Sequence, residues 1–120
     1  MSPDPAAPAR RIDANTERAA RTFLRQLDGK YAVVDALLYG SRARGDHKPD
    51  SDADIAIILK GECGDRYEVV RDLGGIEFDV MLETGIFIQA VPFWEDEFKE
   101  PTRFNNPALI ANIKREGVRL

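Results

Sequence analysis

Apolar residues recur at three- and four-residue steps near the start of the chain and then gather into short continuous runs. The first pattern predicts an amphipathic helix from about Arg11 to Leu27, which Asp28-Gly29 ends. Residues 31–39 and 52–59 are rich in Val, Leu and Ile, so they predict two strands with substantial burial. Ser41–Asp46, between the two strands, can form a short helix.

The second half of the chain is less regular, apart from its last helix. Residues 65–73 are compatible with a short helix or an irregular crossover. Within Ile76–Leu82, apolar Phe78, Val80 and Leu82 alternate with other residues, which predicts a third strand. Residues 86–91 predict a further extended segment. Asn106 is a natural N-cap before Pro107, and Gly117 ends the helix that follows.

Composition narrows the class of protein. The chain has 120 residues, 43% hydrophobic and 32% charged, which suits one globular domain at 10–120 after a disordered leader at 1–9. The net charge of −4 disfavours a nucleic-acid partner, because proteins that bind the phosphate backbone usually have a basic surface. The single cysteine, Cys63, excludes a disulfide framework. The sequence has no signal-like or membrane-spanning stretch, so we expect a cytoplasmic protein without a membrane partner.

The sharpest chemical feature is a pair of carboxylates, Asp52 and Asp54, at the entry to the second strand. Side chains two positions apart on a strand point to the same face, and hard divalent cations such as Mg²⁺ prefer oxygen ligands. A solvated pair would be the better interpretation of an isolated Asp-x-Asp. Here the strand continues into an apolar run, which places both carboxylates at the rim of the core.

Gly40, Ser41 and Arg42 follow the first strand and supply candidate phosphate ligands. Glycine permits close approach of the backbone to an anion, the serine adds a hydroxyl, and a guanidinium pairs well with phosphate. Glycine followed by serine is also a common loop opening. The two features together therefore predict a nucleotide triphosphate and Mg²⁺ in one site.

Asp79 is the third candidate carboxylate, because it interrupts the apolar positions of the predicted strand 76–82. If this strand lies beside the strand of Asp52 and Asp54, three carboxylates converge and could hold two metal ions. The alternative is an edge position that faces water, with Glu77 on the same face.

Gly40-Ser41, ten intervening residues, and Asp52-Ala53-Asp54 resemble the signature of the minimal nucleotidyltransferase family of the DNA polymerase β-like superfamily. The ending Ile113–Val118 also resembles the tails of these small proteins. The resemblance implies an α+β fold with a small mixed sheet flanked by helices. It implies Mg²⁺ ligands at Asp52, Asp54 and Asp79, and nucleotide contacts from Gly40 and Ser41.

By the same resemblance, the activity is transfer of AMP from ATP to a hydroxyl group. Minimal members are often antitoxins that adenylylate a partner toxin of the HEPN ribonuclease family. Two alternatives stay open: a binding module that masks its partner without catalysis, and a transferase acting on a small hydroxylated molecule. The aromatic segment Pro92–Phe98 either packs over the sheet or forms a partner-binding patch.

Overall fold

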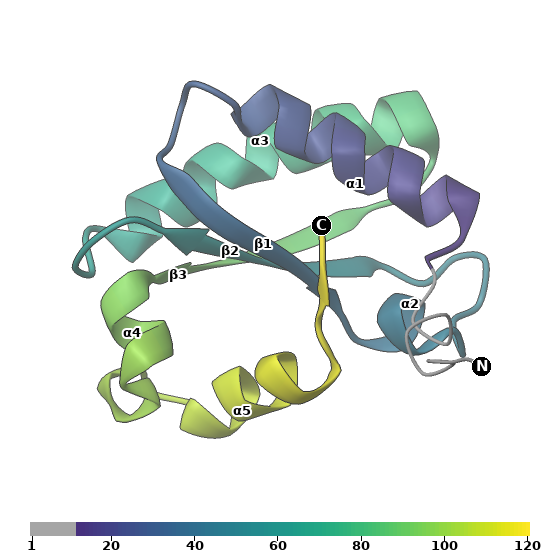
Figure 1. Ribbon diagram of the computed structural model, residues 1–120. Helices are drawn as coiled ribbons and strands as arrows, with labels where there is room; N and C mark the ends of the chain where they lie inside the picture. Colours follow the sequence, from purple (N-terminus) through teal and green to yellow (C-terminus); the bar gives the residue numbers. More distant parts are fainter. Residues whose placement is uncertain (1–11) are drawn as a thin grey trace, which may run out of the picture.

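The computed structural model describes residues 12–120, and the predicted leader at residues 1–9 lies outside them. Figure 1 shows a central sheet with α1 and α3 on one face and α4 and α5 on the other. In chain order the elements are α1 (Ala14–Leu27), β1 (Val33–Tyr39), α2 (Ser41–Arg44), β2 (Ala53–Leu59), α3 (Arg66–Thr84), β3 (Ile88–Trp94), α4 (Glu95–Lys99), the 3-10 turn η2 (Pro101–Arg103), α5 (Pro107–Glu116) and β4 (Val118–Arg119).

The four strands form a mixed sheet in the order β3-β2-β1-β4. β1 runs antiparallel to β2 and to β4, whereas β2 and β3 are parallel. The predicted α+β class, with a small mixed sheet flanked by helices, is confirmed. Antiparallel pairing brings the end of β1 to the start of β2, where Tyr39 is in register with Asp54.

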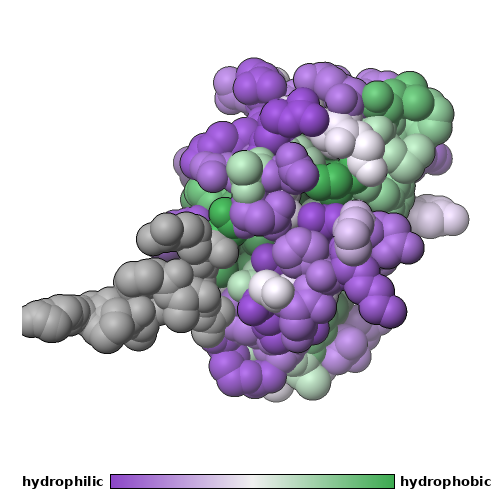
Figure 2. Space-filling model, turned by 90° about the vertical axis from the view of Figure 1, so that its right-hand side faces the viewer, coloured by the Kyte–Doolittle hydropathy of each residue, from purple (hydrophilic) through white to green (hydrophobic). Residues whose placement is uncertain are grey.

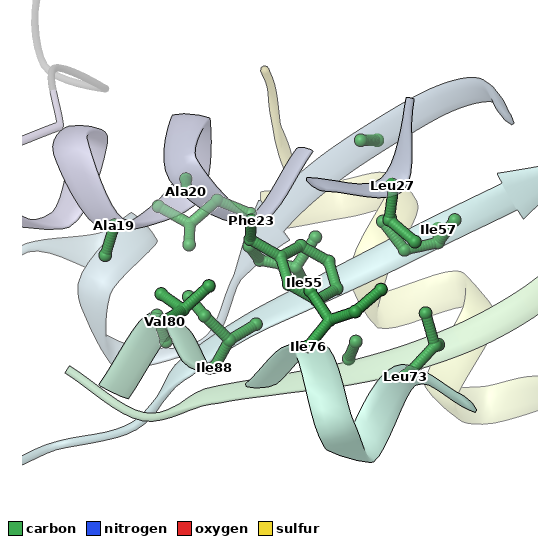
Figure 3. Close-up of a cluster of buried hydrophobic side chains, with 14 of the residues drawn as sticks. Ala19, Ala20, Phe23, Leu27, Ile55, Ile57, Leu73, Ile76, Val80 and Ile88 are labelled. Atoms are coloured by element: carbon green, nitrogen blue, oxygen red, sulfur yellow. The ribbon is translucent and has the colours of Figure 1, made fainter. Parts of the chain in front are cut away.

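Two hydrophobic clusters cover the two faces of the sheet. β2 contributes to both, as its uninterrupted apolar run predicted. The larger cluster lies between the sheet and the helices α1 and α3 (Figure 3), and its members include Phe23, Leu27, Ile55, Ile57, Leu73, Ile76, Val80 and Ile88. The smaller cluster lies under α5 and comprises Tyr39, Ala56, Ile58, Phe93, Ile110 and Ile113.

Capping contacts mark several helix ends, and the predicted N-cap of the last helix, Asn106, is confirmed. The Asp13 carboxylate accepts a hydrogen bond from the Thr16 amide at the start of α1. Asn106 caps α5 in the same way, with its side chain accepting from the Leu109 amide. Gly45 closes α2 in the left-handed conformation. These caps satisfy backbone donors that the first turn of a helix leaves without a partner.

The predicted third strand at Ile76–Leu82 is wrong, because these residues form the second half of α3. The buried residues of α3 recur at helical steps, and tertiary packing of this stripe against α1 and β3 decides the structure. The apolar alternation that suggested a strand is coincidental, since Phe78 and Leu82 are exposed. The strand beside β2 is instead β3, which corresponds to the extended segment predicted at 86–91.

Two further predictions concerned contacts beyond the domain. The aromatic segment Pro92–Phe98 packs against the sheet: Phe93 is fully buried, Trp94 nearly so, and the Phe98 ring lies 5.6 Å from that of Phe93. This confirms the packing interpretation over a partner-binding patch. Within residues 12–120, no helix combines the length and the apolar character that crossing a membrane requires.

Candidate nucleotide and metal site

Gly40 forms the turn between β1 and α2, and its conformation requires glycine. Its φ of 78° is in the left-handed region. A Cβ atom at this position would lie 2.3 Å from Oδ2 of Asp54. The backbone of the turn therefore lies directly against a carboxylate of the predicted acidic pair. Two segments that the sequence separates by more than ten residues meet at this contact.

Asp54 is the half-buried member of the acidic pair, and Asp52 is exposed just before β2. Burial raises the pKa of Asp54, and the negative charges of Asp52 and Glu116 raise it further, whereas the positive charge of Arg44 lowers it. Asp52 and Asp54 are thus near enough to repel each other. Two carboxylates that repel each other are stabilised by a cation between them, and carboxylate oxygens suit a hard divalent cation such as Mg²⁺. Such a cation usually keeps several water ligands and completes its coordination with phosphate oxygens.

Asp54 faces the α5 side of the sheet. Side chains alternate along a strand, so Asp54 shares its face with Ala56 and Ile58, which pack in the cluster under α5. The end of α5 accordingly reaches the site. The Gly40 amide donates to Oε1 of Glu116 at 2.9 Å, and Nη1 of Arg44 lies 3.1 Å from the same oxygen.

Sequence reasoning missed Glu116 and Arg44 as site residues. Glu116 enters the sequence argument only within the C-terminal motif Ile113–Val118, and Arg44 does not enter it. Arg44 is exposed, and it pairs with both Glu116 and Asp46. The signal that could have identified Glu116 is its position as the last residue of a well-capped helix, although pairing with Gly40 spans 76 positions.

Arg42 is buried rather than open to a ligand, with 3% of its surface exposed. Its guanidinium donates to the carbonyl oxygens of Ser51 and Pro49 and to the hydroxyl of Thr16. These bonds tie the loop that carries Asp52 to α1 and α2. The predicted contact of Arg42 with a triphosphate stays a prediction, and this placement argues against it. Ser41 is partly exposed at the first position of α2, and its predicted contact with phosphate stays a prediction.

The structure does not bring Asp79 to the acidic pair, because the strand on which that prediction rested is a helix. Asp79 lies exposed on α3, which covers the opposite face of the sheet. The residue of β3 in register with Asp54 is Gln89. Glu77, the other candidate, accepts a hydrogen bond from the Ala90 amide. Among residues 12–120, no three Asp, Glu, His or Cys side chains are grouped as a ready metal site.

Comparison with protein families places this geometry in a known context. A family model described as "Nucleotidyltransferase domain" matches residues 17–120, which include the Gly40 turn and both aspartates of the pair. The chain belongs to this family. The nucleotidyltransferase domain therefore occupies almost the whole length of the chain, and its first matched residue lies in α1.

Two individual proteins resemble this nucleotidyltransferase domain. A Methanocaldococcus jannaschii protein named "Putative protein adenylyltransferase" is 28% identical over 113 residues, covering 86% of this chain and 95% of that protein. A crystal structure from Sulfolobus solfataricus, described as a "putative nucleotidyltransferase", aligns with a TM-score of 0.46 and 19% identity, covering 91% of this chain and 87% of that one.

Proposed function

We propose that this nucleotidyltransferase transfers AMP from ATP to a hydroxyl group of a partner protein. The observation that carries the proposal is the contact between Gly40 and Asp54, because it joins the phosphate turn and the acidic pair into one site. The name of the Methanocaldococcus jannaschii relative supports a protein acceptor. The resemblance to minimal nucleotidyltransferases further suggests a HEPN-family ribonuclease toxin as this partner, which makes the protein an antitoxin.

In the proposed reaction, the acceptor oxygen forms a bond to the α-phosphorus of ATP. The bond from this phosphorus to the oxygen that bridges to the β-phosphate breaks, so pyrophosphate leaves and the hydroxyl proton passes to water. The protein contributes mainly by holding the two reactants in line and by placing charge around the phosphates. Asp79 has no part in this scheme, because it lies on the other face of the sheet.

Asp52 and Asp54 would hold Mg²⁺. The raised pKa of Asp54 supports this assignment, because burial and the nearby charge of Asp52 disfavour an ionised carboxylate that lacks a cation. When bound, Mg²⁺ would supply neutralisation of the charge on the phosphate oxygens.

The Gly40 amide and the Ser41 hydroxyl would contact the outer phosphates. The Gly40 amide donates a hydrogen bond to the carboxylate of Glu116. This bond supports a phosphate-binding role for the turn, because it shows that the amide is placed to bind a negatively charged oxygen. A phosphate oxygen that took this bond would replace the Glu116 carboxylate. Arg44, which pairs with Glu116, would then be left beside the phosphate and could stabilise its charge.

Transfer of label from ATP labelled at the α-phosphate tests the proposal. The purified protein is incubated with Mg²⁺, labelled ATP and the protein encoded beside it. We expect label on the partner, and a loss of about 100-fold or more for Asp52→Asn and Asp54→Asn, the order seen when one charge-stabilising group is removed from an active site.

Asp79→Asn is the matched control, because it removes the same charge from the opposite face of the sheet and should label the partner at the normal rate. Label on a small hydroxylated molecule instead of a protein would correct the acceptor and retain nucleotidyl transfer. Equal labelling by Asp54→Asn, or no transfer by the unaltered protein, would refute the proposal. If the double variant Asp52→Asn, Asp54→Asn transferred no label and still neutralised the partner, the result would favour a binding module that acts without catalysis.

A further inference from the structure

Helix α3 has an apolar face that nothing in the described chain covers. Its buried stripe packs against α1 and β3, yet the opposite side of the helix also carries large apolar residues. Tyr67, Phe78 and Leu82 are 83%, 54% and 68% exposed, respectively. Figure 2 shows apolar surface gathered on the side of the molecule where α3 ends. Phe78 and Leu82 lie about one turn apart on the helix, and neighbouring exposed apolar side chains of this kind mark interaction sites on many proteins.

The exposed face of α3 is symmetric about its middle. The centre of the helix falls at Gly74-Gly75, with Arg71 and Phe78 at equal distances on either side. Tyr67 and Leu82 lie farther out, again at equal distances. At about 100° per residue these positions share one side of the helix. We name Tyr67, Arg71, Gly74, Gly75, Phe78 and Leu82 the α3 face.

The chain's own packing does not explain the two glycines of the α3 face. A Cβ atom at Gly74 or Gly75 would meet no atom within 4 Å. Glycine in a helix interior is less stable than alanine by about 1 kcal/mol. Small residues at the middle of an exposed helix do, however, let a second helix approach closely at that point.

We propose that the α3 face binds the α3 face of a second copy of this chain, with the two helices antiparallel about a two-fold axis at Gly74-Gly75. A two-fold interface uses the same patch on both subunits, so the patch must be complementary to itself. In this arrangement Tyr67 of each copy lies beside Leu82 of the other, and Arg71 lies beside Phe78. A guanidinium over an aromatic ring is a favourable contact.

Charge complementarity supports a second copy as the occupant. Asp79 follows Phe78 at the edge of the α3 face, about 80° around the helix from Arg71. A two-fold axis at Gly74-Gly75 would bring Arg71 of one copy and Asp79 of the other to nearly the same height along the helices. Arg71 of one copy would therefore approach Asp79 of the other, and the pair would form twice. Within residues 12–120, neither Arg71 nor Asp79 takes part in an ion pair or a side-chain hydrogen bond. Because α3 lies opposite the acidic pair, this dimer leaves the nucleotide site open.

Sedimentation equilibrium of the purified full chain tests the proposal. We expect a dimer whose population rises with protein concentration. Arg71→Glu and Asp79→Arg should each lower the association constant by about tenfold or more, since each places like charges together at the interface. The double variant, which exchanges the two charges, should recover most of the association. Lys99→Glu, a charge reversal in α4 on the other face of the sheet, is the matched control and should dimerise normally.

Thermal melts of each variant separate loss of association from loss of folding, because all three substituted positions are exposed. A monomer at every concentration up to about 100 µM, well above typical dissociation constants of specific interfaces, would overturn the proposal. It would also be overturned if the double variant associated no better than either single variant. A monomer in which Arg71→Glu abolishes binding of a different protein would reassign the α3 face to that partner.

Discussion

Gly40 is the residue on which the site geometry depends most directly. Its positive φ sets the direction of the chain after β1, and the missing side chain leaves room for the Asp54 carboxylate. A sequence can suggest glycine in such a turn, but only the fold reveals which side chain approaches it. The pairing of Tyr39 with Asp54 across β1 and β2 produces this approach.

Gly40→Ala should therefore be much more damaging than Gly45→Ala. Both positions have positive φ. Gly45 lies in the left-handed helical region, where alanine costs about 1–2 kcal/mol, whereas the ψ of −159° places Gly40 in a region that is open essentially to glycine alone. Only at Gly40 would the added Cβ also meet Asp54, because no atom lies within 4 Å of the corresponding position at Gly45. Chemical denaturation and nucleotidyl transfer, measured together, check this expectation. Equal losses of stability and activity in the two variants would contradict the proposed contact.

The roles of Arg42 and Glu116 show what residue-level reasoning could not supply. A guanidinium beside a phosphate turn is a reasonable clamp, yet Arg42 is turned inward and bonds to three groups of the chain itself. Glu116 reaches the same turn from the far end of the chain. Both outcomes depend on long-range packing, which local residue type does not encode.

At the scale of elements, α1 depends on a charged N-cap. Partial burial raises the pKa of Asp13, but hydrogen bonds from the Thr16 hydroxyl and amide, with the charges of His47 and Arg42, outweigh it and lower the pKa. Replacement by alanine should cost about 1 kcal/mol of stability.

The contribution of Asp13 should depend on pH. A lowered pKa in the folded state stabilises the fold above the ordinary carboxyl pKa of about 3.9, and this stabilisation is lost as pH falls through the lowered value. Asn at this position keeps a capping oxygen without the charge. The melting temperature of the unaltered protein should thus fall relative to that of Asp13→Asn between about pH 5 and 3, where the Asp13 carboxylate takes up its proton. A constant difference across this range would exclude a charged cap.

Most elements could be predicted from sequence, and α3 shows why one could not. The patterns before Leu59 gave the right order of helix and strands, because each has clear periodicity and marked ends. In α3, apolar residues lie on both sides of the helix and two glycines interrupt it, so neither period dominates. The wrong assignment of this element also led to the wrong location for Asp79, because the position of a side chain depends on the helix or strand that carries it.

At the scale of the whole molecule, the sheet divides the protein into two functional sides. The acidic pair, the Gly40 turn and the end of α5 meet on one side, whereas α1 and α3 cover the other. The proposed chemistry and the proposed self-association thus use separate surfaces. The family match over residues 17–120 includes every residue of the candidate site.

The most direct test of the account is the affinity for ATP, measured by titration calorimetry with and without Mg²⁺. We predict that the protein binds ATP in the presence of Mg²⁺ and that Asp54→Asn weakens this binding by about tenfold or more, as expected for loss of a metal ligand. Asp79→Asn should bind as the unaltered protein does. Binding that is indifferent to Mg²⁺ and to Asp54→Asn, or that is lost with Asp79→Asn, would contradict a single site built from the Gly40 turn and the acidic pair.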